Sequence, residues 1–291
     1  MTTASCQAVQ RSFNDFLTGS LDPSRNACTL GHLDGCGRCW ARWNQFRWAK
    51  AEGHPLLGEL RAYLDERGLP FTPLRDSSRE LADIWREHTT AGASRRDFFA
   101  TSTAYLYNLV IWEASGNRPD YTAHAPALLA SHETVTDLGC GIGSDTIALR
   151  TLGHRVQPVD YLSPSTDFAR WRFRQRGDHD DPRIVEPDEP MSRPPAALWS
   201  IDTLDHVPDL HSQLGSLLSA ALVVVTENPA VHRAHGDHGY YIRRTADEID
   251  RAFAYYDLNP APASAPGSPV KAWMRAPQLS VLTRNAAGSR T

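Results

Sequence analysis

The chain has 291 residues, of which 41% are hydrophobic and 22% charged, and its formal net charge at pH 7 is −4. This length suits one medium domain with an appendage or two small domains, and the acidic balance does not favour nucleic acid as a partner. No apolar run approaches the roughly 18 residues of a membrane-spanning helix. The opening residues, MTTASCQAVQRSF, lack a signal-peptide pattern, so we expect a cytoplasmic protein without a membrane partner.

Four of the five cysteines lie in the first 40 residues and indicate a metal site. His32, Cys36 and Cys39 form an H-x3-C-x2-C pattern. On a single helix this spacing brings the three side chains to one face, where they can hold three positions of a tetrahedral Zn²⁺. A first helix over residues 6–17 begins at Cys6 and could supply the fourth ligand. Because the cytosol is reducing, we do not expect disulfides here.

The segment from residue 6 to residue 43 resembles the zinc-binding anti-sigma fold, whose helix carries the same H-x3-C-x2-C spacing. The resemblance implies a structural Zn²⁺ held by Cys6, His32, Cys36 and Cys39. Cys28 lies one helical turn before His32 and is the rival of Cys6. An iron–sulfur cluster and unliganded thiols are the alternatives to zinc.

The next part of the chain is predicted to be mostly helical. Apolar residues follow the i, i+3, i+4 pattern over 56–64, and Gly68 ends that helix. Further helical segments are predicted over residues 77–88, 97–116 and 121–132. The tryptophan and phenylalanine side chains just before this part are expected to dock the zinc hairpin onto the rest of the chain or onto a protein partner; they are Trp40, Trp43 and Phe46.

Strands and helices alternate from residue 134 onward. Such alternation predicts right-handed βαβ units and a parallel sheet. The segment 257–270 is rich in proline, alanine and serine and is predicted to be a loop. The predicted strands cover residues 134–139, 154–161, 183–186, 196–202, 221–227 and 279–285. The predicted helices between them cover residues 144–153, 164–177, 209–220 and 245–256.

A glycine-rich loop follows the first of these strands. Asp137, Gly139, Gly141 and Gly143 form D-x-G-x-G-x-G. A nucleoside cofactor can approach the backbone closely only where no Cβ intrudes, and the carboxyl edge of an open α/β sheet is where such ligands bind. Loops for NAD and other nucleotides share this feature, and a glycine turn without a ligand is a further alternative.

The amino-acid sequences of two motifs favour one cofactor over the others. VTDLGCGIGSDTIAL resembles motif I of class I S-adenosylmethionine-dependent methyltransferases, and LWSIDTLDHVPDL resembles the fourth-strand motif of that family. Asp160 ends the second predicted strand, where a carboxylate can accept both ribose hydroxyls of a nucleoside. The resemblance covers about residues 130–230.

The resemblance implies a role for each matching position. Residues 139–141 would pack against the methionine and ribose portions, and Asp137 would lie near the amino group of the cofactor. Asp160 would bind the ribose, Tyr161 would flank the adenine, and residues 200–202 would line the pocket near the methyl group. The complete cofactor set is Tyr105, Asp137, Gly139, Cys140, Gly141, Gly143, Asp160, Tyr161, Ser200, Ile201 and Asp202.

Two of the implied positions are less sharply defined than the others. Tyr105 could reach the cofactor carboxylate from a helical lid, although an aromatic residue at helical spacing is also a normal core residue. Glu186 and Asp188 compete as the residue at the edge of the adenine.

The acceptor side rests on the segment ENPAVHRAHGDHGYY after the strand at 221–227. His232, His235 and His238 recur every three residues, and we expect His232 or His235 to act as a base. A metal site and a solvated loop are the alternatives. Glu227 ends the strand and could face the acceptor.

The predicted fold is a Rossmann-like α/β sheet with helices on both faces, preceded by a mostly helical region. The predicted domains are a zinc hairpin over 1–53, a helical lid over 54–130 and a cofactor domain over 131–291. The predicted function is methyl transfer from S-adenosylmethionine to a small molecule, with a structural zinc. The alternatives are a zinc-containing regulatory or redox-sensing module and a non-methylating enzyme that uses the same cofactor.

Overall fold

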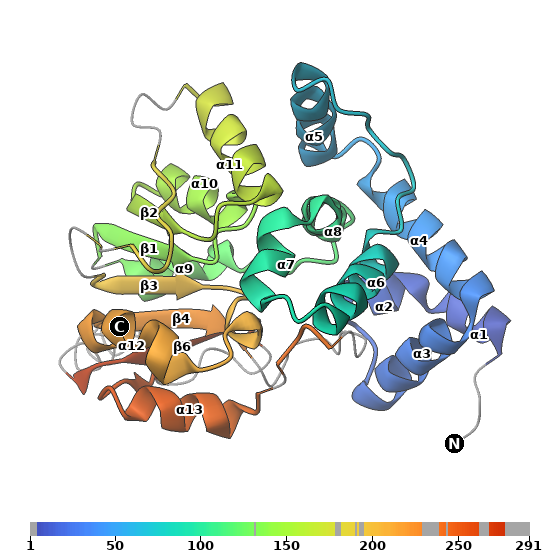
Figure 1. Ribbon diagram of the computed structural model, residues 1–291. Coiled ribbons are helices and arrows are strands. Elements are labelled where there is room, and N and C mark those ends of the chain that lie inside the picture. Colours follow the sequence, from blue (N-terminus) through green and yellow to red (C-terminus); the bar gives the residue numbers. More distant parts are fainter. Residues whose placement is uncertain are drawn as a thin grey trace, which may run out of the picture. The chain divides into compact units, whose positions relative to one another are not determined.

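The computed structural model describes residues 5–130, 132–177, 182–189, 191, 195–228, 239–242, 244–261 and 268–276 (Figure 1). The contacts divide the chain into two compact units. The helical unit comprises Met1–Pro119, Ser163–Arg172 and Arg233–Tyr240, and the sheet unit comprises Asp120–Leu162, Phe173–His232 and Tyr241–Thr291. No helix in the described part of the chain is long and apolar enough to cross a membrane.

The helical unit begins with eight helices in its described part. They are α1 (Cys6–Arg11), α2 (Phe13–Thr18), α3 (Pro23–Gly35), α4 (Gly37–Ala51), α5 (Pro55–Glu66), α6 (Ser77–Thr90), α7 (Arg95–Thr101) and α8 (Thr103–Ala114). Local capping explains several of their starts. Asp22 accepts the amides of Ser24 and Arg25 at the start of α3, and Ser94 forms a capping box with Asp97 at the start of α7.

Three helices expected from the sequence are broken in the structure. The helix predicted over residues 97–116 is divided at Ser102 into α7 and α8. The helix predicted over residues 6–17 is divided at Ser12 into α1 and α2. The H-x3-C-x2-C pattern was expected on one helix face, but α3 ends at Gly35 and α4 begins at Gly37. Cys36 between them is extended, with φ −125° and ψ 94°. Glycine on both sides of Cys36 weakens helix continuity, so this prediction was wrong about the local structure.

The hairpin of α1 to α4 has its own small core. The ring of Trp43 lies 5.3 Å from that of Phe13 and 5.1 Å from that of Phe16, and it stacks on Phe46 at 5.9 Å. The indole of Trp40 donates to Asp76 at 2.7 Å, just before α6. These aromatic residues therefore hold α2 against α4, and Trp40 joins the hairpin to the next part of the helical unit.

The sheet unit contains six described strands in the order β2-β1-β3-β4-β6-β5. They are β1 (Thr134–Leu138), β2 (Arg155–Val159), β3 (Ala197–Ser200), β4 (Val223–Glu227), β5 (Asn259–Pro260) and β6 (Val270–Met274). Neighbours among β1 to β4 are parallel, whereas β6 is antiparallel to β4 and β5 is antiparallel to β6. The predicted α/β fold is confirmed, but the expectation of a fully parallel sheet was wrong.

The C-terminal strands were not predicted correctly. The segment 257–270, expected to be a loop, contains β5 and the first residue of β6. Pro260 has no amide N–H, which suits an edge strand. The strand expected over 279–285 lies outside the described residues. The strand expected over 183–186 is reduced to one bridge, in which Val185 pairs with Val159.

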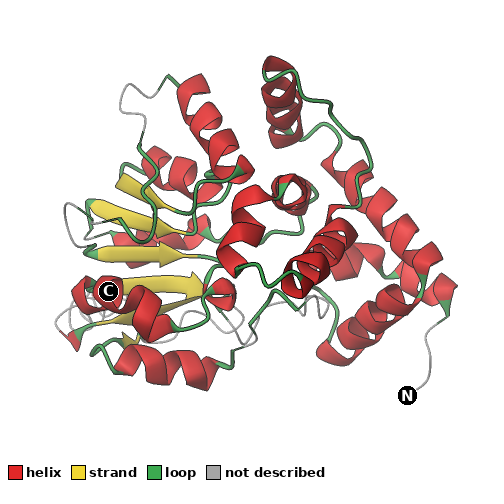
Figure 2. Cartoon of the chain, viewed as in Figure 1, coloured by secondary structure: helices red, strands yellow, loops and turns green. Residues whose placement is uncertain are grey.

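Helices cover both faces of the sheet (Figure 2). On one face, Leu138, Leu198 and Val224 share a buried cluster with Leu214 of α12 (Leu210–Ala220) and Phe253 of α13 (Ala246–Ala254). Burial of such side chains provides the main driving force for this packing.

On the other face, polar side chains of β1 and β3 reach α10 (Ser144–Thr151). Asp137 accepts the hydroxyl of Thr146 at 2.6 Å, and the indole of Trp199 donates to Asp145 at 2.9 Å. The remaining described helices are η1 (Thr122–His124), α9 (Ala125–Leu129), α11 (Pro164–Gln175) and η2 (Leu204–His206).

Candidate functional sites

The sheet reverses its order of growth between β1 and β3. After β1 the chain adds β2 on one side, and it then crosses back to add β3 on the other side of β1. Ligands of open α/β sheets bind at the carboxyl ends of the strands at such a switch point. The loops after β1 and β3 are therefore the first place to look for a site.

The loop after β1 is built on left-handed backbone. Gly139, Gly141 and Gly143 have φ of 77°, 52° and 77°, a region that favours glycine. At Gly139 packing adds a second requirement, because a Cβ there would lie 2.0 Å from Oγ1 of Thr203. The Thr203 hydroxyl donates to the carbonyl of Leu138 at 3.1 Å. The loop after β3 thus lies directly against the loop after β1. Thr203 was not predicted from the sequence, although it directly follows the expected pocket residues Ser200, Ile201 and Asp202.

Asp160 joins the end of β2 to the glycine loop. Its carboxylate accepts the amide of Gly141 at 2.8 Å and that of Tyr161 at 2.7 Å. Burial raises the pKa of Asp160 to about 6, and the two amide hydrogen bonds oppose this shift. A partly buried carboxylate beside three left-handed glycines fits a ligand that donates hydroxyl groups at this edge of the sheet.

Several other residues expected around the cofactor belong to the strands and loops at this edge. Asp137 is buried and is held by Thr146, as described above. Cys140 and Ile201 are buried, and the hydroxyl of Ser200 is buried without a hydrogen-bond partner among the described residues. Of the two candidates for the adenine edge, Glu186 accepts the amide of Leu162 at 3.4 Å, close along the chain to Asp160.

A group of carboxyl side chains lies where β3 and β4 end. Glu227 accepts the amide of Asp202 at 2.8 Å, and Asp202 has a left-handed φ of 51°. Burial raises the pKa of Glu227 well above its usual range, and the negative charges of Asp202 and Asp205 raise it further. Strained backbone of this kind is frequent at functional sites. Glu227 is therefore a carboxyl group that keeps its proton to higher pH than usual.

Three of the expected site residues fall outside the described part of the sheet unit. Tyr105 belongs to the helical unit, where its ring lies 5.0 Å from that of Phe99. His232 and His235, together with His238, lie outside the described residues.

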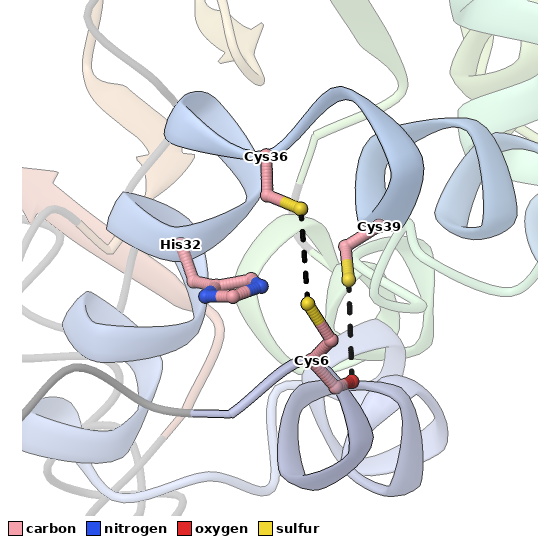
Figure 3. Close-up of side chains that lie close together, drawn as sticks. All are labelled: Cys6, His32, Cys36 and Cys39. Atoms are coloured by element: carbon pink, nitrogen blue, oxygen red, sulfur yellow. Dashed lines mark hydrogen bonds between the residues drawn. The ribbon is translucent and has the colours of Figure 1, made fainter.

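A second site is formed by the expected metal ligands. The potential ligand atoms of Cys6, His32, Cys36 and Cys39 all lie within 4.8 Å of one another (Figure 3). The Sγ atoms of Cys6 and Cys36 are 3.9 Å apart, and two thiolates on a tetrahedral Zn²⁺ lie about 3.8 Å apart. Nε2 of His32 is buried and has no hydrogen-bond partner within the described part of the chain. These donors fit a tetrahedral metal ion.

The break at Cys36 is what brings these ligands together. His32 comes from α3, Cys36 lies between the helices, and Cys39 belongs to the first turn of α4. Cys6 enters from the start of α1, whereas Cys28 is exposed and is not part of the cluster.

The surroundings of the cluster lower the pKa of one of its thiols and raise the pKa of another. A hydrogen bond from the Arg38 guanidinium is the main cause that lowers the pKa of Cys6 to about 6, which favours the thiolate that metals bind. Burial raises the pKa of Cys39, and a hydrogen bond from Gln10 opposes it.

Comparison with solved structures finds partial similarity to several proteins. The pyocyanin biosynthetic protein PhzM is 15% identical over 69% of this chain and 70% of its own, with a TM-score of 0.46. DesVI of Streptomyces venezuelae is 15% identical over 60% of this chain and 99% of its own, with a TM-score of 0.44. The magnesium protoporphyrin IX methyltransferase of Synechocystis PCC 6803 with bound SAM is 15% identical over 53% of this chain and 77% of its own, with a TM-score of 0.41. No family model and no curated protein matches the chain.

Proposed function

We propose that the sheet unit binds S-adenosylmethionine and transfers its methyl group to a small-molecule acceptor. The observation that carries this proposal is the position of Asp160. Its partly buried carboxylate lies at the switch point of the sheet, hydrogen-bonded to the glycine loop. A carboxylate there can accept ribose hydroxyls, and the left-handed loop leaves room for close approach of the ligand.

The other roles are proposed from the resemblance of the sequence motifs. Gly139, Cys140, Gly141 and Gly143 would contact the methionine and ribose portions, and Tyr161 would flank the adenine. Asp137 would lie near the amino group, and Ser200, Ile201 and Asp202 would line the methyl position.

The chemistry requires little from side chains beyond alignment. The sulfonium supplies an activated methyl group, and the protein orients the acceptor toward it. Where the acceptor is protonated, a base must take up its proton, and a group with a pKa near the working pH does so best. We propose Glu227 for this role because it ends β4 and accepts the amide of Asp202, beside the expected methyl position, and because a raised pKa makes its ionised carboxylate a stronger base. His232 and His235 are proposed as further candidates from the sequence pattern alone.

Calorimetric titration with S-adenosylmethionine and S-adenosylhomocysteine tests the cofactor assignment. We expect both to bind the wild-type protein and Asp160→Asn to bind them more weakly. Glu133→Gln is the matched control, because Glu133 is an exposed carboxylate of the sheet unit. If neither compound binds the wild-type protein, the proposed function is wrong.

We also propose that the four-residue cluster of the hairpin holds a structural Zn²⁺. Three thiolates and one imidazole are a usual ligand set for structural zinc, which supplies folding free energy to small modules. Metal analysis of protein purified without added zinc is the test, and about one equivalent is expected. Loss of the metal in Cys6→Ser but not in Cys28→Ser would support the ligand choice, and the reverse result would contradict it.

A further inference from the structure

The side-chain amide of Gln10 links the metal cluster to Arg42, an exposed cation of the hairpin. Gln10 lies on α1, and its Nε2 atom is 3.5 Å from Sγ of Cys39. Its Oε1 atom accepts Nη1 of Arg42 at 2.5 Å. Cys39 and Arg42 are three residues apart on α4, so one amide bridges two neighbouring positions of that helix.

The contact with Arg42 determines which way the amide faces. A guanidinium can only donate hydrogen bonds, so the oxygen of Gln10 must face Arg42. The amide NH₂ group is then directed at the sulfur of Cys39. Arg42 thereby fixes an N–H donor on a metal-facing thiol.

Such a donor has a specific consequence for a bound metal. Zn²⁺ with three thiolates and a neutral imidazole carries one net negative charge. Cys39 is 0% exposed, so water cannot reach its sulfur to offset that charge. An N–H donor stabilises the thiolate and fixes the orientation of its lone pairs, which is how outer-sphere partners tune metal sites.

We infer that Gln10, held by Arg42, is a positioning residue of the metal site that strengthens metal binding through the sulfur of Cys39. This inference rests on the proposed zinc site. It adds two residues that neither the cysteine spacing nor the ligand cluster identifies.

The test compares Gln10→Glu with Gln10→Ala. Glutamate keeps the length of the side chain and can form an ion pair with Arg42, so the hairpin itself should be no less stable. It replaces the N–H donor, however, with a carboxylate oxygen beside the thiolate. We expect a dissociation constant for Zn²⁺ at least about tenfold higher for Gln10→Glu, measured by competition with a chromophoric chelator. Gln10→Ala should weaken binding by a smaller factor.

One control variant and one further test variant separate a role of Gln10 in metal binding from a role in folding. Gln7→Ala alters an exposed residue on the same helix and should leave the dissociation constant unchanged. Arg42→Ala, at another exposed position, frees the amide of Gln10 and should weaken binding without any change in the ligands. Cobalt substitution supplies a spectroscopic readout, because a changed donor to Cys39 shifts the thiolate-to-cobalt charge-transfer band.

The outcomes for the two proposals are distinct. If the wild-type protein binds neither zinc nor cobalt, the proposed metal site is wrong. If the wild-type protein binds zinc and Gln10→Glu binds it equally tightly with an unshifted cobalt spectrum, the role of Gln10 is overturned. Far-UV circular dichroism at saturating zinc checks folding. If a Gln10 variant does not fold, unchanged affinity and spectrum in Arg42→Ala would overturn the inference instead.

Discussion

At the scale of single residues, the cofactor edge depends on contacts between two loops. Gly139 is left-handed and lies against Thr203, whose hydroxyl also holds the end of β1. Asp160 reaches the same loop from the end of β2. Each of these contacts joins segments that are distant in sequence, so substitutions here should affect the loop geometry more than the strands.

The first prediction concerns the close approach at Gly139. Gly139→Ala combines a left-handed backbone with a collision against Thr203, whereas Gly153→Ala meets only the backbone cost, because nothing lies within 4 Å of its Cβ. We expect Gly153→Ala to lower the free energy of unfolding by about 1–2 kcal/mol. Gly139→Ala should cost about 1–3 kcal/mol more, as overpacking does. Urea unfolding measures both, and equal costs would contradict the packing argument.

The second prediction concerns the pH dependence at Asp160. Ribose hydroxyls donate to the ionised carboxylate, so binding favours the form that has lost its proton. Because the pKa of Asp160 is raised to about 6, the dissociation constant of S-adenosylhomocysteine should rise about tenfold per pH unit below that value and level off above it.

Titration calorimetry between pH 5 and pH 7 measures this dependence. Glu133→Gln should follow the wild-type profile, whereas Asp160→Asn should bind weakly with no such slope. A wild-type profile that is flat across this window would contradict the assigned role of Asp160.

At the scale of elements, a polar contact fixes the antiparallel strand β6 against α13. Asp250 of α13 accepts Nζ of Lys271 at 2.6 Å and the indole of Trp273 at 2.7 Å. Trp273 is fully buried and belongs to the cluster beneath α12 and α13. The strand β6 is thus held by one helix through both a charge and a buried indole.

The third prediction removes this contact. Asp250→Ala leaves the buried indole of Trp273 without that acceptor and Lys271 without that ion-pair partner. We expect the free energy of unfolding to fall by about 1–3 kcal/mol. Asp247→Ala, at an exposed position of the same helix, should change it by less than about 0.5 kcal/mol. Urea denaturation followed by circular dichroism compares the two, and equal midpoints would argue against this role for Asp250.

At the scale of the whole molecule, the two units contain separate hydrophobic clusters. The cluster of the hairpin comprises few residues and includes Cys39, and the cluster of the sheet unit comprises the strands with α12 and α13. A small core supplies little folding free energy, so we expect the hairpin to depend on its metal and the sheet not to.

The fourth prediction follows from this difference. Chelation of zinc should speed amide hydrogen exchange in α1 to α4, because their own core is too small to hold them. Exchange in β1 to β4 should stay slow. Mass spectrometry of peptides after exchange measures both regions, and the Gln7→Ala variant should behave as the wild type does. Unchanged protection of α1 to α4 after chelation would contradict a structural role for the metal.

Features that depend on local patterns could be predicted from the sequence alone. Hydrophobic periodicity and glycine positions were sufficient for the parallel strands β1 to β4 and for the loop after β1, because each pattern lies within a few residues. The H-x3-C-x2-C spacing identified three members of the metal cluster, since their separation along the chain is short.

Features that depend on contacts between distant residues became known only from the tertiary structure. The choice of Cys6 over Cys28 as a member of the cluster and the contact of Gln10 with Cys39 each depend on contacts between separate helices. The antiparallel direction of β6 depends on its pairing with β4, and the requirement for Gly139 depends on Thr203. Long-range contacts of this kind leave no period or spacing in the sequence, so the sequence pattern cannot predict them and only the folded structure shows them.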